Sequence, residues 1–234
     1  MANLKIDKLT SLDLQSLLSF IGISCMLVAL FAISVSIINH LSQHGWQLFL
    51  LTPQILSNYL HSPLAIVYNL AILIAGIGCL LCSICLALLK INAYFQLVAI
   101  FSSTTAITLI LQGIFPSNYL AINSLLYYCW IICSTLLFLL VFVSYMTQQQ
   151  VIGIYMLTLS ALGFFSGLLL LGQLNFHQFT IPTCQINGQD FCKFSVIMWL
   201  HFQISLWWFV MMGLKCRQLA IGHYQRHARS QLYG

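Results

Sequence analysis

The sequence predicts an all-α fold: an integral membrane bundle of six transmembrane helices, with residues 1–234 forming one polytopic domain. Hydrophobic residues make up 61% of the chain and charged residues only 5%, whereas a soluble domain has about 25% charged residues. A transmembrane helix needs about 20 predominantly apolar residues. Stretches of this kind cover residues 17–39, 63–89, 92–115, 120–145, 151–171 and 194–214, and a basic tail follows over residues 215–234.

The first apolar stretch, residues 17–39, follows a polar and partly basic start. It is too long for the apolar region of a signal peptide, and no Ala-x-Ala follows it, so we expect a span that is retained. Residues 41–61 mix polar and apolar side chains and contain Trp46 and Tyr59. Because these aromatic residues favour the membrane interface, we expect a short amphipathic helix that lies on the membrane.

The second stretch, residues 63–89, is predicted to be the central helix. Ser62 is placed to cap it, and Pro63 suits its first position. Between membrane helices the hydrophobic effect is weak, so faces of small residues that allow close backbone contact decide the packing. Gly76 belongs to one such face, with Cys79 and Ser83. The other face has the 4,3,4,3 spacing of Ala71, Ala75, Gly78, Cys82 and Cys85.

The remaining stretches follow one another closely. The segment Gly113-Ile-Phe-Pro116 ends the third, because the residue before proline disfavours the helix. The fourth starts a few residues later, so these two form an antiparallel hairpin. The fifth carries Gly163-x-x-x-Gly167, a helix-packing face, and a polar loop over residues 172–193 leads to the sixth.

Charge predicts the orientation. An even number of spans places both termini on one side, and that side then holds seven of the eight lysines and arginines. Only Lys193 lies on the other side. The positive-inside rule therefore predicts that both termini are cytoplasmic, in a multi-pass protein of a bacterial inner membrane. Basic residues at both chain ends favour anionic lipid headgroups as partners, rather than nucleic acid.

Several of these features together resemble a bacterial family of six-span membrane proteins, the domain of unknown function 998 family. They are the segment His61-Ser-Pro-Leu-Ala-Ile-Val-Tyr-Asn69, the glycine-rich second stretch, and the Phe-Pro that closes the third. The resemblance covers roughly Leu17 to Arg217. The family places an acidic residue after the Phe-Pro and a histidine near the start of the fourth helix, where this sequence has Asn118 and Asn123. The resemblance implies a six-helix bundle and no established activity.

The polar residues inside the spans are the candidate site. His201, Asn69, Gln112 and Asn123 all fall in the outer half of the membrane in this topology. We expect His201 to point into the bundle, because an unpaired polar ring in hydrocarbon costs several kcal/mol. At least two of the four are expected to meet around an outward-opening polar cleft that binds a ligand. Hydrogen bonding between helices is the simpler interpretation of the same residues.

The cysteines divide into two groups. Cys79, Cys82 and Cys85 have a spacing that in a soluble loop suggests a metal or iron–sulfur site, but on a membrane helix packing explains them better. Cys184 and Cys192 share the outer loop, and we expect them to form a structural disulfide there.

The histidines at the outer end are a second candidate for metal binding. His40, His44, His61 and His177 suit a transition metal, and equally suit a wet interface. We expect no metal or other cofactor.

The leading functional hypothesis is a non-enzymatic membrane protein that interacts with lipid, a protein partner or a second copy of itself through the polar cleft. A transporter of a small molecule or lipid is the first alternative. The spans contain no Asp, Glu, Lys or Arg, which argues against ion-coupled transport. A membrane thiol oxidoreductase or metal-dependent enzyme is the second alternative. Against an enzyme, the spans contain no carboxylate that could orient His201.

Thiol labelling tests the predicted orientation. An impermeant reagent applied to reduced intact cells is expected to label Cys184 in the outer loop and to leave Cys216 at the start of the tail unlabelled. Labelling of Cys216 without Cys184 would contradict the orientation.

Overall fold

The six predicted spans are present as helices. The computed structural model describes residues 2–90, 92–147, 153–176, 181 and 192–232. Within these residues, six helices are long and apolar enough to cross a membrane, which confirms the predicted fold class of a multi-pass α-helical membrane protein. They are α1 (Ala2–His44), α2 (Ala65–Leu88), α3 (Ala93–Ile114), α4 (Leu120–Thr147), α5 (Ile154–Leu171) and α6 (Lys193–Leu232).

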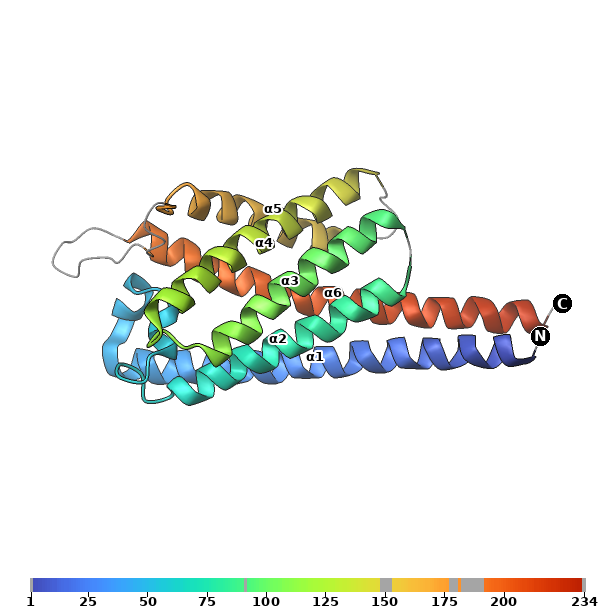
Figure 1. Cartoon of the computed structure of the whole chain (residues 1–234), viewed down its shortest axis with the longest axis horizontal. Helices are drawn as coiled ribbons and strands as arrows, with labels where there is room; N and C mark the ends of the chain where they lie inside the picture. Colours follow the sequence, from blue (N-terminus) through green and yellow to red (C-terminus); the bar gives the residue numbers. More distant parts are fainter. Residues whose placement is uncertain (1, 91, 148–152, 177–180, 182–191, 233–234) are drawn as a thin grey trace.

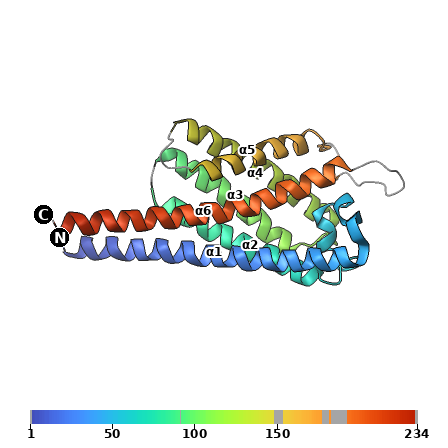
Figure 2. The same ribbon diagram turned by 180° about the vertical axis from the view of Figure 1, so that it is seen from behind.

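The helices form a closed bundle in chain order. Each helix packs against the next, and α6 returns to lie beside α1 and touches α2 (Figures 1 and 2). Both termini lie at one end, which we call the inner end; the opposite end is the outer end. Large apolar side chains face outward on several helices, such as Phe31 at 72%, Ile66 at 69% and Phe165 at 62% exposure. These faces suit contact with lipid tails.

Helices α1 and α6 are much longer than predicted. They contain 43 and 40 residues and extend beyond the other four helices at the inner end, side by side (Figures 1 and 2). Their apolar segments are Leu14–Gln43 and Lys193–Ile221, and the flanking residues 2–13 and 222–232, which are mostly polar, are helical too. The expected tail from residue 215 is therefore a continuation of α6. No proline interrupts either helix, so the backbone hydrogen bonding continues into the polar segments.

The outer connection between α1 and α2 differs from the prediction. Helix α1 ends where Gly45 takes a left-handed conformation with φ of 59°. Two short 3₁₀ helices follow, η1 (Gly45–Leu50) and η2 (Pro53–Ser57). Leu48 and Leu56 on these helices are completely buried, so this segment packs onto the outer end of the bundle instead of lying on the membrane.

The predicted cap of α2 is wrong. The helix begins at Ala65 with Leu64 at the cap position and no side-chain capping bond. Ser62 and its neighbours form a turn, in which the Ser62 amide bonds to the Asn58 carbonyl at 2.9 Å. This turn follows η2, so α2 begins later in the sequence than predicted.

Helix α2 is central, as predicted. A Cβ atom on Gly78 would lie 2.8 Å from the Gly22 carbonyl oxygen of α1. A Cβ atom on Gly76 would lie 2.7 Å from the Ile110 amide nitrogen of α3. The two small faces thus bring the backbones of α1 and α3 into contact with α2 from two sides.

Glycine substitutions test these contacts. Gly76→Ala and Gly78→Ala are each expected to lower the free energy of unfolding in detergent by about 1–3 kcal/mol, because the added methyl group meets backbone atoms that do not yield easily. Gly172→Ala is the control, since the nearest atom to its Cβ would be at an ordinary 3.5 Å. Equal stability of all three variants would contradict the close packing.

Candidate functional site

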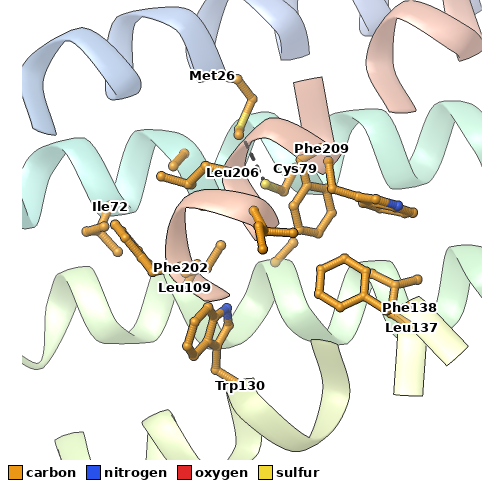
Figure 3. Close-up of a cluster of buried hydrophobic side chains, with 14 of the residues drawn as sticks. Met26, Ile72, Cys79, Leu109, Trp130, Leu137, Phe138, Phe202, Leu206 and Phe209 are labelled. Carbon is orange, nitrogen blue, oxygen red and sulfur yellow. Dashed lines mark hydrogen bonds between the residues drawn. The ribbon is translucent and has the colours of Figure 1, made fainter. Parts of the chain in front are cut away.

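Aromatic and sulfur-containing side chains fill the centre of the bundle. Trp130 and Phe138 of α4 meet Phe202 and Phe209 of α6 in a buried cluster (Figure 3). Ring pairs such as Trp130–Phe202, with centroids 6.1 Å apart, pack edge to face. This packing surrounds His201, a histidine in the middle of the bundle.

His201 of α6 has no exposed surface. Its Nε2 lies 2.8 Å from the Ser134 hydroxyl of α4, and its Nδ1 lies 2.9 Å from the Ser166 hydroxyl of α5. The rings of Trp130 and Phe138 approach it at centroid distances of 5.0 and 5.7 Å. His201 therefore points into the bundle, as predicted, and ties three helices together.

The two serines also bond to the backbone. The Ser134 hydroxyl donates to the Trp130 carbonyl at 2.7 Å, and the Ser166 hydroxyl donates to the Gly163 carbonyl at 3.0 Å. A neutral imidazole carries one N–H, so one ring nitrogen donates to its serine while the other accepts from its serine. A hydroxyl has one hydrogen, so the serine that accepts from the ring keeps its bond to the backbone carbonyl, and the serine that donates to the ring gives that bond up. Rotating both hydroxyl groups reverses these roles without moving the ring. The site therefore accommodates either tautomer.

The other three predicted site residues bond elsewhere. Asn69, Gln112 and Asn123 are 4%, 4% and 2% exposed. The Asn69 amide donates to the Ser57 carbonyl at 3.1 Å, Gln112 donates to the Leu126 carbonyl at 3.4 Å, and Asn123 donates to the Phe115 carbonyl at 2.7 Å. Among the described residues none of the three bonds to His201. Ligand binding by this set stays a prediction, and the enclosed His201 ring is not open to an outward-facing cleft.

Sequence reasoning missed the partners of His201. Ser134 and Ser166 are two of many serines in the spans, and most of those bond to the carbonyl of the preceding turn, as Ser160 does to Met156 at 2.7 Å. The sequence indicated only how deep each polar residue lies in the membrane. Depth does not identify which helix faces pack against each other.

Helices α4, α5 and α6 form a tightly packed half of the bundle around His201. A Cβ atom on Gly163 would lie 2.5 Å from the Phe138 ring, so the predicted packing face of α5 is confirmed. The Trp208 indole donates to the Ser160 hydroxyl at 2.9 Å.

The cysteines of α2 pack as small residues. Cys79, Cys82 and Cys85 are completely buried, and a Cβ atom on Gly22 or Gly213 would lie 2.6 or 3.0 Å from the Cys82 sulfur. No group of three or more histidine, cysteine or acidic side chains could hold a metal in the described part of the chain.

Two predictions depend on residues that are not described. The Cys184–Cys192 disulfide involves Cys184, which lies outside the described residues, so this pairing stays a prediction. The same holds for a metal site at the outer histidines, because His177 and the side chain of His44 lie outside them too.

The burial of Cys216 changes the labelling experiment. Cys216 is 1% exposed, so its lack of labelling would not report the side of the membrane. A cysteine introduced by Lys90→Cys, at an exposed position of the inner end, reports the side of the membrane instead.

A cavity opens at the inner end of the bundle. It has a volume of about 20 Å³ and is formed by five helices, α2 to α6. The lining residues are Leu86, Phe95, Val98, Val141, Met156, Met212, Lys215, Cys216 and Leu219. All are apolar except Lys215.

Comparisons with known proteins find no match: no family model, no curated protein and no solved structure is similar to this chain. The resemblance to the domain of unknown function 998 family therefore stays a prediction.

The hydrogen bonds of His201 are testable by a double-mutant cycle. Ser134→Ala and Ser166→Ala are each expected to cost about 1 kcal/mol of unfolding free energy, because each leaves one ring nitrogen unpaired in an apolar interior. Combined with His201→Leu, either serine substitution should have a much smaller effect. Ser24→Ala is the control, because its hydroxyl is exposed and bonds only to its own helix. Additive effects would contradict the coupling.

Proposed function

We propose that this protein is a non-enzymatic membrane protein that binds an anionic lipid at its inner end. The observation that carries the proposal is the cavity formed by α2 to α6, whose single charged lining residue is Lys215. A membrane lipid combines the two properties that this cavity selects, an apolar chain and a charged headgroup.

The cavity walls suit an acyl chain. Leucine, valine and phenylalanine side chains form most of the lining, and the rest consists of two methionines, Met156 and Met212, with Cys216 and Lys215. A volume of about 20 Å³ admits only the end of a chain. Methionine side chains are unbranched and adapt their shape, so they allow the cavity to lengthen around an entering chain.

Lys215 supplies the charge. Its side chain is half-buried, and a lysine in this setting buries its alkyl stem while the ammonium group reaches the polar boundary. The chain has three acidic residues, and none lies on the segments that line the cavity. Since none of the residues that line the cavity is acidic, an anionic headgroup would supply the counter-ion there. Arg217 lies on another face of α6, with its guanidinium 5.6 Å from the centre of the Phe20 ring of α1, and does not line the cavity.

A protein partner or a second copy of the chain is the second candidate. The helical extension of α1 and α6 beyond the spans favours it, because helices that project past the membrane offer a surface to an aqueous partner (Figure 1). The outward-opening cleft has less support, since His201 has no exposed surface.

Native mass spectrometry of the purified protein tests lipid binding. Phosphatidylglycerol is expected to bind more tightly than phosphatidylcholine. Lys215→Gln should weaken phosphatidylglycerol binding about fivefold, corresponding to about 1 kcal/mol for one cation near a lipid headgroup, and should leave phosphatidylcholine binding unchanged.

Lys90→Gln is the matched control. Lys90 lies at the same end of the bundle, but its side chain is exposed and does not line the cavity. A second variant, Val98→Phe, fills the cavity and should weaken the binding of both lipids. Equal binding of the two lipids, or an equal effect of the two lysine substitutions, would contradict the proposal.

A further inference from the structure

Several buried polar atoms in the outer half of the bundle have no hydrogen-bond partner among the described residues. They are the Gln54 and Trp130 side-chain N–H groups, the Asn69 side-chain oxygen and the hydroxyls of Ser62, Tyr68 and Ser117. A buried polar group left unsatisfied costs about 1–3 kcal/mol, and most such groups bond to protein or to ordered water. So many in one half of a membrane bundle require an explanation.

The outer members of this set adjoin Ser57 of η2. The Ser57 carbonyl accepts from Asn69 at 3.1 Å, and the Ser57 hydroxyl accepts from the Ser117 amide at 3.1 Å. The same hydroxyl donates to the Gln54 carbonyl at 2.8 Å. Asn118, the next residue, is exposed and accepts from the Tyr59 amide at 3.1 Å. The set therefore begins at the outer surface of the protein.

The inner members continue from there to His201. Tyr68 precedes Asn69 on α2, and its hydroxyl lies beside the Tyr127 hydroxyl of α4, which carries the row across to that helix. The Tyr127 ring lies 6.0 Å from the Trp130 ring, and the Trp130 ring lies 5.0 Å from His201, between centroids. Trp130, drawn in Figure 3, is completely buried, and its indole N–H has no partner among the described residues.

We propose that water molecules occupy the interior along this row of polar atoms, from the outer end of the bundle to the side of His201. The row offers both donors and acceptors, and no charged side chain belongs to it. A water molecule both donates and accepts, and a buried one typically makes about three hydrogen bonds to groups that otherwise lack partners.

The hydrated row gives the bundle two unlike halves. The outer half connects His201 to the outer solution through exchangeable protons, whereas the inner cavity is lined by apolar residues apart from Lys215 and only the Gln15 side-chain oxygen of the described inner end lacks a partner. This inference is independent of lipid binding, because it involves none of the residues that line the cavity.

Hydrogen exchange of two tryptophans tests the proposal. Trp130 and Trp208 are both completely buried, but only the Trp208 indole has a protein partner among the described residues, the Ser160 hydroxyl. In ¹⁵N-tryptophan-labelled protein in lipid nanodiscs, the Trp130 indole N–H should exchange with solvent deuterium at least tenfold faster than that of Trp208. Trp130→Phe assigns the signal. Equal or slower exchange at Trp130 would overturn the proposal.

Two variants separate water from a missing hydrogen bond. Ser160→Ala removes the hydrogen-bond partner of the Trp208 indole, but Trp208 still lies outside the row of polar atoms. The Trp208 indole N–H should therefore still exchange at least tenfold more slowly than that of Trp130. Exchange as fast as that of Trp130 would overturn the proposal. Tyr68→Phe keeps the ring and removes a hydroxyl from the row, so it should slow exchange at Trp130 at least threefold and leave Trp208 unchanged. An unchanged rate at Trp130, together with a raised melting temperature, would show a dry orphan hydroxyl instead.

Discussion

The close approach of α2 to its neighbours is the contact on which the rest of the bundle depends. In lipid the helices gain little by hiding apolar surface from one another, so close packing has to hold them together. At Gly76 and Gly78 the backbones of α3 and α1 lie so close to α2 that an added Cβ atom would clash with them. Cys82 fits beside Gly22 and Gly213, so α6 joins the same seam. With α1, α3 and α6 fixed around α2, the short connection from Ile114 to Leu120 places α4 beside α3.

The second half of the bundle is held by a different interaction. The helices α4, α5 and α6 meet at His201, where two serines satisfy both ring nitrogens. Polar bonds between membrane helices are individually weak, about 0.6 kcal/mol on average. They are specific, however, because a rotation of any of the three helices would leave a buried ring nitrogen unpaired. Small-residue contacts thus set the distances between helices in one half, and polar bonds set the helix rotations in the other.

Polarity is distributed unevenly along the bundle axis. Most of the buried polar atoms without partners in the described chain lie toward the outer end, around Ser57 and Asn69, whereas the inner cavity is apolar apart from Lys215. Water and lipid are the two solvents that a membrane protein meets, and each of these regions suits one of them. This contrast supports the two proposals separately, so that either one can fail without the other.

The sequence by itself determined the fold class, the six spans and the central place of α2, because apolar length and small-residue spacing are local properties of the chain. Burial of His201, Asn69, Gln112 and Asn123 was likewise predictable, since a polar side chain in a span turns away from lipid. Only the tertiary structure decided which residues meet. Ser134 and Ser166 became the partners of His201 because of how three helices are rotated, and rotation depends on contacts between segments far apart in the chain. The cavity at Lys215 likewise exists only where five helix ends converge, and no one stretch of sequence contains that information.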